Sequence, residues 1–112
     1  MVKAKTELFS IDLSHTAQIF KALSHPARLS ILNYISQCGS CITGDISDEL
    51  PLGRTTVNQH LKELKDMGFI KGDIEGAKTK YCINTDQLNL HKTDVISFLN
   101  KLNSCNSNNN CE

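Results

Sequence analysis

The 112-residue sequence contains no tryptophan, only four phenylalanines and two tyrosines, and no net charge. With so few aromatic side chains, the core has to be built mainly from leucine and isoleucine. No apolar run approaches the roughly 20 residues that a membrane-spanning helix needs. The basic residues 1–5 have no apolar stretch behind them that would make a signal peptide. We therefore expect one cytoplasmic domain without membrane contact. Its hydrophobic core is modest in size, and dimerisation would enlarge it.

The five cysteines form an odd set, which argues against a closed disulfide framework. Cytoplasmic thiols are normally kept reduced. We therefore expect five reduced thiols, able to bind a soft ion or to react with an oxidant.

Basic charge collects in one segment, residues 54–82, which carries six lysines and arginines against four acidic residues. In this segment Val57, Leu61 and Leu64 fall on one side of a helix at about 100° per residue, and Gly68 ends the helix. The first turn and the opposite side carry side chains that can reach a base edge or a phosphate. These candidate DNA-binding residues are Arg54, Thr55, Thr56, Asn58, Gln59 and Lys62.

A short β-hairpin rich in lysine follows this helix. Its tip is at residues 75–77, and residues 80–83 (KYCI) return with the polar–apolar alternation of a half-buried strand. A helix with a polar outer face followed by a basic hairpin is typical of the recognition helix and wing of a winged helix-turn-helix. In that arrangement Lys78 and Lys80 of the wing are candidate DNA contacts.

Three helices are expected before the recognition helix. Apolar residues recur at steps of three and four over residues 12–23, and Pro26 opens a second helix that ends near residue 37. Ile42, Ile46 and Leu50 then mark a short third helix, with Thr43 as its N-cap.

A last helix is expected at residues 88–102, and its apolar positions extend around much of the circumference. Since a surface helix of a monomer needs only one apolar stripe, this favours packing against a second subunit. The prediction is therefore a mainly α winged helix-turn-helix with about five helices and a two-stranded wing. It comprises an arm at residues 1–10, the DNA-binding and dimerisation domain at 11–102, and a disordered Asn/Ser-rich tail at 103–112.

Four segments resemble the ArsR/SmtB family of repressors, in the family's order. Residues 22–32 (ALSHPARLSIL) resemble its opening motif, and residues 56–64 (TVNQHLKEL), with 67–70 (MGFI), resemble its recognition helix and exit. Residues 80–83 look like the end of its wing. Asn58 departs from the serine that is usual there, which affects base preference rather than fold.

The resemblance implies a homodimer whose first and last helices form the interface. Such a repressor binds a pseudo-palindromic operator and releases it when an inducer binds. The inducer is usually a metal or metalloid, and sometimes an oxidant or a reactive sulfur species. By this resemblance His60 matches a family histidine, and its position at the edge of the apolar face favours a packed or phosphate-contacting side chain over a metal ligand.

Two sensing sites of the family are missing from the sequence. The zinc-type site on the last helix needs an Asp-x-His pair and a second histidine-rich pair, but residues 86–88 read Asp-Gln-Leu, and His91 is followed only by Asp94. The arsenic-type site needs two cysteines just before the recognition helix, and residues 41–46 have neither in register. A different ligand set is therefore required.

The remaining candidates are Cys38 and Cys41, in a Cys-x-x-Cys pair, and Cys105 and Cys111 in the tail. Thiolates select thiophilic ions, and trivalent arsenic takes three of them. The tail pair plus one of the first pair would supply that number, so arsenic or another soft metal is the expected inducer. Cys82, on the outward phase of the wing strand, is expected to be incidental.

Three alternatives remain open for these thiols. A cysteine pair could switch by oxidation or persulfide chemistry, four thiolates could hold a structural zinc ion, or the tail thiols could be inert. An enzyme is not expected, because no βαβ unit accompanies the Cys-x-x-C pair and no catalytic constellation is evident. A winged helix that binds only protein is a further alternative.

Overall fold

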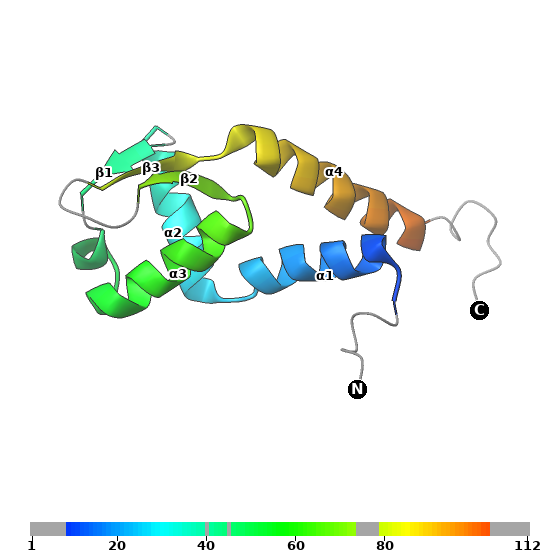
Figure 1. Cartoon of the computed structure of the whole chain (residues 1–112), viewed down its shortest axis with the longest axis horizontal. Coiled ribbons are helices and arrows are strands. Elements are labelled where there is room, and N and C mark those ends of the chain that lie inside the picture. Colours follow the sequence, from blue (N-terminus) through cyan, green and yellow to red (C-terminus); the bar gives the residue numbers. More distant parts are fainter. Residues whose placement is uncertain (1–8, 40, 45, 74–78, 104–112) are drawn as a thin grey trace.

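A computed structural model describes residues 9–39, 41–44, 46–73 and 79–103. Within these ranges four α-helices, one 3-10 helix and three strands make up the chain (Figure 1). In order they are α1 (Ile11–Leu23), α2 (Pro26–Gln37), β1 (Cys41–Thr43), η2 (Ser47–Glu49), α3 (Arg54–Asp66), β2 (Ile70–Asp73), β3 (Lys80–Ile83) and α4 (Thr85–Leu102). The predicted mainly α winged helix-turn-helix fold is confirmed.

The helix ends follow from local chemistry that the sequence makes visible. The Ser10 hydroxyl accepts a hydrogen bond from the backbone N–H of Leu13 and so caps α1. His25 directly precedes Pro26, which occupies the first position of α2. Nδ1 of His25 accepts a hydrogen bond from the backbone N–H of Ala27 and so caps this helix. After α3, Gly68 adopts a φ of 88°, the left-handed conformation that glycine accepts most easily.

The predicted third helix over residues 42–50 is wrong. Residues 41–43 instead form β1, in which Ile42 pairs with Tyr81 of β3. Among the described residues between β1 and α3, the helical ones are those of η2. Thr43 is therefore a strand residue and caps no helix. Gly44, with a φ of 86°, turns the chain out of the strand. Ile42 and Ile46 are both buried, so the apolar spacing identified core positions correctly but assigned them the wrong backbone.

The predicted two-stranded wing is a three-stranded antiparallel sheet in the order β1-β3-β2. The third strand, β1, comes from the segment expected to be helical. Ile42 and Tyr81 face the core, while their neighbours alternate outward, as strand geometry requires. Gly72 opposite Tyr81 has a φ of 115°, and a Cβ there would lie 2.3 Å from the carbonyl oxygen of Lys80. Only glycine fits this close approach.

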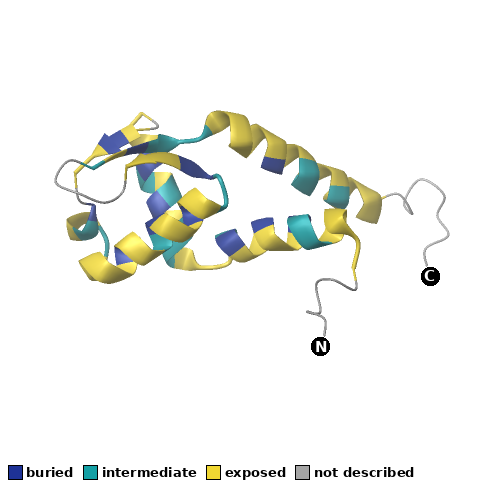
Figure 2. Ribbon diagram, viewed as in Figure 1, coloured by how far each residue is buried: buried dark blue, intermediate teal, exposed yellow. Residues whose placement is uncertain are grey.

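The core lies between α2, α3 and the sheet, and α1 joins it through Ile19 and Ala22. Figure 1 shows α1 and α4 running side by side away from this core as a pair of arms. Along α4 the one buried residue is His91, and Figure 2 shows most of this helix exposed. No described helix is long and apolar enough to cross a membrane.

A broad apolar surface remains exposed on the α1–α4 arms. It comprises Phe9, Ile11, Leu13, Phe20, Leu88, Leu90, Ile96, Leu99 and Leu102. We call this set the arm surface. Exposed apolar side chains in such number on two helices are typical of an interaction surface.

Candidate nucleic-acid interface and cysteine sites

The two faces of α3 differ sharply in exposure. Val57, Leu61 and Leu64 are at most 2% exposed and anchor the helix to the core. All six candidate DNA-binding side chains on this helix are exposed: Arg54, Thr55, Thr56, Asn58, Gln59 and Lys62. The outer face of α3 therefore presents hydroxyl, amide and cationic groups, which are the groups that read base edges and phosphates in a major groove.

The wing contributes one described candidate residue. Lys80 is exposed on β3, where it stands opposite Asp73 of β2 and Thr43 of β1. Lys78 lies outside the described residues, as does the predicted tip at 75–77. A lysine on the outward phase of the wing strand is suited to contact phosphate rather than to read bases.

A polar cluster between α2 and α3 holds the recognition helix in place. Arg28 of α2 donates from Nε to Nδ1 of His60 at 3.1 Å, and its guanidinium also forms an ion pair with Glu63 one turn further along α3. The same guanidinium donates to the carbonyl oxygens of Lys21 and Ala22 at the end of α1. One half-buried arginine thus ties three helices together.

His60 is held as a neutral acceptor in this cluster. Burial lowers the pKa of His60, and the nearby charges of His25 and Arg28 lower it further, while Glu63 acts in the opposite direction. The ring of His25 lies 4.5 Å from that of His60, centroid to centroid. His60 is therefore a packed side chain in this structure, which is one of the two roles that the sequence favoured for it.

Comparison with known proteins agrees with this geometry. Residues 25–71, which span α2 to the start of β2, match the family model of bacterial regulatory proteins of the arsR family. An uncharacterised HTH-type transcriptional regulator of Methanocaldococcus jannaschii is 35% identical over 86 residues, covering 77% of this chain and 92% of the relative. The chain belongs to the ArsR family.

Two further relatives are named for metal or metalloid resistance. The cadmium resistance regulatory protein CadC homolog of Staphylococcus aureus is 28% identical over 103 residues, covering 86% of this chain and 85% of the relative. The arsenical resistance operon repressor of Bacillus subtilis is 29% identical over 89 residues, covering 80% and 81%. Since the relatives are transcriptional regulators and repressors, the predictions of a DNA-binding repressor and of no enzyme activity are confirmed.

Of the cysteines in this ArsR-family chain, Cys38 is the free thiol among the described residues. It is exposed at the C-cap of α2. A side-chain hydrogen bond with Cys38 is the main cause that raises the pKa of Tyr34, with smaller contributions from charge on Cys38, desolvation and Glu49. Cys38 is thus accessible to a soft ion or an oxidant, and Tyr34 is its neighbour.

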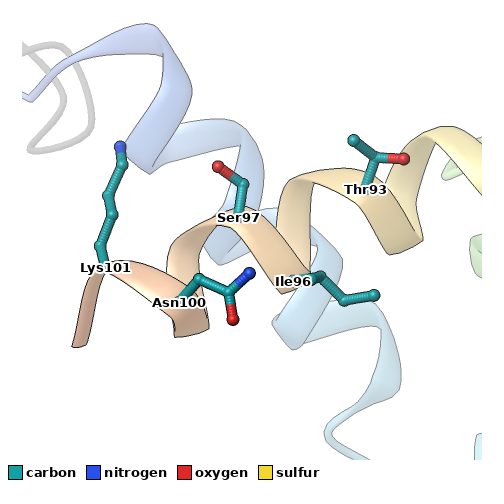
Figure 3. Close-up of a pocket in the computed structure, with 5 residues that line it drawn as sticks. All are labelled: Thr93, Ile96, Ser97, Asn100 and Lys101. Atoms are coloured by element: carbon teal, nitrogen blue, oxygen red, sulfur yellow. The ribbon is translucent and has the colours of Figure 1, made fainter. Parts of the chain in front are cut away.

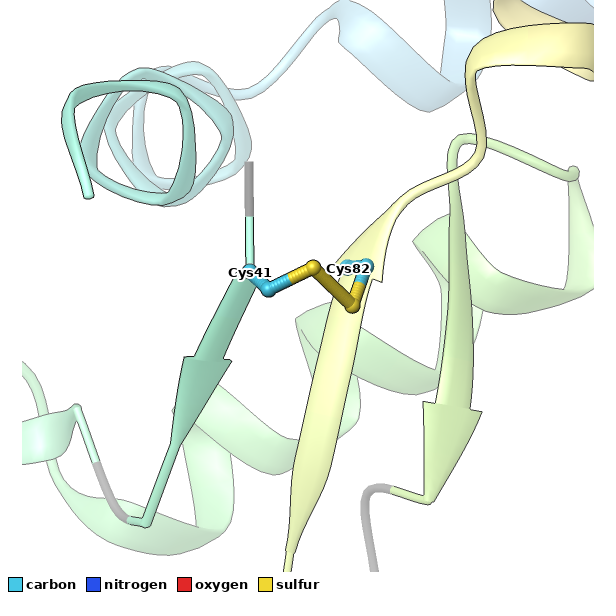
Figure 4. The surroundings of a disulfide bond; sticks show 2 residues. All are labelled: Cys41 and Cys82. Carbon is cyan, nitrogen blue, oxygen red and sulfur yellow. A yellow bond between two sulfur atoms is a disulfide. The ribbon is translucent and has the colours of Figure 1, made fainter. Parts of the chain in front are cut away.

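Cys41 and Cys82 form a disulfide between β1 and β3 (Figure 4). The two residues are direct partners in the antiparallel ladder, with Cα atoms 3.9 Å apart. The expectations that these two thiols are reduced and that Cys82 is incidental are therefore wrong for this state of the protein. In this state Cys41 cannot act as a thiolate ligand, and the sheet is covalently closed on its outer face.

The sequence did not predict the pairing of Cys82 with Cys41, because the segment that forms β1 was predicted to be helical. With β1 recognised, the outward phase of Cys82 would have placed its side chain on the same face as that of Cys41. The sequence does show two cysteines at outward positions, but only the register between β1 and β3 shows that they are neighbours.

The tail cysteines, Cys105 and Cys111, lie outside the described residues. The helix that precedes them in the chain, α4, ends at the opposite end of the molecule from β1, which closely follows Cys38 in the chain (Figure 1). Within one chain the structure therefore does not bring Cys38 beside the end of α4.

A shallow depression of about 570 Å³ lies along the outer side of α4 (Figure 3). All of its lining residues belong to this one helix: Thr93, Ile96, Ser97, Asn100 and Lys101. A hollow built on one helix surface has no opposing wall to enclose a ligand. We interpret it as part of an uncovered helix face, adjoining the arm surface at Ile96.

The lowered pKa of His60 sets the direction of a pH effect on stability. Below the ordinary histidine pKa of about 6.5, the unfolded chain binds a proton that the folded chain resists, so stability falls as pH falls towards the lowered folded pKa. His60→Gln keeps an acceptor for Arg28 but cannot titrate. Between about pH 7.5 and about pH 5.5, this variant should lose less thermal stability than the wild type in melts followed by circular dichroism. Equal losses of thermal stability in the two proteins would contradict a lowered pKa of His60 in the folded protein.

Proposed function

We propose that the chain acts in the cytoplasm as a homodimeric repressor that binds a pseudo-palindromic operator through α3 and the wing. The observation that carries this is the orientation of α3: its apolar stripe is buried and its polar face is exposed over the whole length of the helix. Arg54, Thr55, Thr56, Asn58, Gln59 and Lys62 would lie in the major groove, with Lys78 and Lys80 on phosphates.

The arm surface supports dimerisation through α1 and α4. Leu99 and Ile96 are almost half exposed in the single chain, and Leu102 is 63% exposed. Burying such side chains against a second copy would remove apolar area from water at about 25 cal/mol per Å². A two-fold axis between the arms would set two copies of α3 at a fixed separation, which is what two half-sites of a palindrome require.

For the inducer we propose a thiophilic species, with trivalent arsenic first. Cys105 and Cys111 would supply two thiolates. The third would be Cys38 of a second copy, since within one chain α4 ends far from β1. Cys41 could join only after its disulfide is reduced. Each thiol proton leaves with a hydroxide of arsenous acid as water, so three waters are released per arsenic bound. Two relatives named for cadmium and arsenical resistance support this choice of ion.

A redox-responsive repressor is the second candidate, and the Cys41–Cys82 disulfide favours it. Disulfides in cytoplasmic proteins are mostly transient or redox-sensing. The two thiols would give two electrons and two protons to hydrogen peroxide, which leaves as two waters. The bond so formed ties the wing strand β3 to β1, close ahead of the recognition helix.

The base-reading role of α3 is tested at Gln59. Gln59→Ala should weaken binding to the operator by about 1–3 kcal/mol while leaving binding to random DNA nearly unchanged. Lys80→Ala should weaken both by similar amounts and lower the salt dependence, because a phosphate contact carries no sequence information. Electrophoretic mobility shift with the chain's own promoter region measures both. Equal loss on both DNAs for Gln59→Ala would show that Gln59 does not read a base.

The dimer is tested by a charge on the arm surface. Leu99→Glu should give monomers in sedimentation at micromolar concentration and abolish operator binding, because two carboxylates would be buried at the two-fold interface. Leu29→Glu on α2 is the matched control, since Leu29 is 51% exposed against 46% for Leu99 but lies off the arm surface. A monomeric wild type, or a dimeric Leu99→Glu, would overturn this interface.

The inducer is tested on operator-bound protein under reducing conditions. Arsenite should release DNA from the wild type, while Cys105→Ser and Cys111→Ser should need at least about tenfold more arsenite, or about 1.4 kcal/mol of lost coupling. Cys82→Ser should respond like the wild type. If all four proteins respond alike, the tail is not the sensor. If arsenite has no effect under reducing conditions, but peroxide added without a reductant releases DNA from the wild type and not from Cys82→Ser, the redox candidate replaces it.

A further inference from the structure

Two histidines and an aspartate meet where α1 packs against α4. His15 comes from α1, and His91 and Asp94 come from α4. One ring nitrogen of each histidine and one carboxylate oxygen of Asp94 all lie within 4.8 Å of one another. Nε2 of His15 is 3.4 Å from Oδ2 of Asp94. This group lies between α1 and α4 and shares no residue with the Cys41–Cys82 pair.

The environment of His91 fixes which of its nitrogens can bind. The side chain is 4% exposed, and its Nε2 lies 2.7 Å from the carbonyl oxygen of Met67. A carbonyl only accepts, so Nε2 carries the proton and Nδ1 of the neutral ring carries a lone pair. Nδ1 is buried and has no hydrogen-bond partner among the described residues. A buried acceptor without a partner is costly, and it is the atom left to meet a ligand.

This hydrogen-bond pattern is the one found around metal-ligating histidines. Such a ring binds the ion through one nitrogen and donates its other N–H to a carbonyl or carboxylate, which fixes the tautomer. Two imidazoles and one carboxylate form a nitrogen–oxygen donor set that suits zinc and neighbouring first-row ions, and not the thiophilic ions that cysteines select. His15 and Asp94 are each partly exposed, so an ion can enter from solvent.

We propose that His15, His91 and Asp94 form a zinc(II) site within one subunit. The ion would take Nδ1 of His91, a ring nitrogen of His15 and a carboxylate oxygen of Asp94, with water as fourth ligand. By linking α1 to α4 it would stabilise the arms, and through the hydrogen bond from His91 to Met67 it would fix the C-cap of α3. The site is independent of the thiol inducer.

The test uses full-length, untagged protein in which only this cluster competes for zinc. Cys38→Ser, Cys105→Ser and Cys111→Ser are combined, and non-reducing buffer keeps the Cys41–Cys82 disulfide closed. If that protein does not fold, wild type with its free thiols alkylated replaces it. Zinc(II) is titrated against a chromogenic chelator, and melting is compared in zinc and in EDTA.

One zinc ion per chain should bind and raise the melting temperature. His15→Gln and Asp94→Asn, at partly exposed positions, should each lower zinc affinity at least tenfold while leaving the melting temperature in EDTA nearly unchanged. His25→Gln is the matched control and should keep full affinity, because His25 lies outside the cluster. Cobalt(II) should give d–d absorption without thiolate charge-transfer bands.

Nitrogen-15 NMR of the histidine rings distinguishes ligation from simple packing. Zinc should shift the Nδ1 resonance of His91 and leave its Nε2 protonated. The proposal is overturned if no zinc binds, if His15→Gln and Asp94→Asn bind it as tightly as the parent, or if His25→Gln loses it. It is equally overturned if zinc leaves the His91 resonances unmoved.

Discussion

The structure depends on the burial of one narrow stripe on α3. Val57 and Leu64 are fully buried and Leu61 nearly so, and each such side chain contributes about 1.5–3 kcal/mol when removed from water. Rotation of the helix by one residue, about 100°, would exchange this stripe for polar side chains. Burial therefore fixes the rotation of α3, and the rotation determines which six side chains point outward. The Arg28 cluster then sets where α3 lies relative to α1 and α2.

Elements stabilised within their own segment could be predicted from the sequence. The ends of α1, α2 and α3 depend on caps and stops such as Ser10, Pro26 and Gly68, which act on residues a few positions away. The prediction of a helix over residues 42–50 was wrong because apolar residues at a spacing of four suit both a helix and a strand followed by a turn. What decided it was the pairing of Ile42 with Tyr81, 39 residues further along the chain. No local pattern contains that contact.

In the candidate sites, too, some features follow from local sequence and others depend on tertiary contacts. The outward side chains of α3 follow from helical periodicity alone, and their exposure agrees with the prediction. The Cys41–Cys82 bond needs the register between β1 and β3, and the group at His15 needs the packing of α1 on α4. His15 stands one turn before the buried Ile19, and His91 stands one turn before the half-buried Val95. Each lies on the inner face of its helix, but only the tertiary structure shows that the two faces meet.

The two ends of the recognition helix are connected to chemically different groups. Ahead of α3, β1 carries a sulfur bond to the wing strand; after it, the carbonyl of Met67 accepts a hydrogen bond from a buried imidazole. Thiols respond to thiophilic ions and oxidants, whereas two imidazoles with a carboxylate suit zinc and similar ions. A ligand at either end alters DNA binding only if it has a different affinity for the DNA-bound and free arrangements of α3. Because one continuous helix carries both the buried stripe and the exposed polar face of α3, a shift at either end of the helix has to move its outer face.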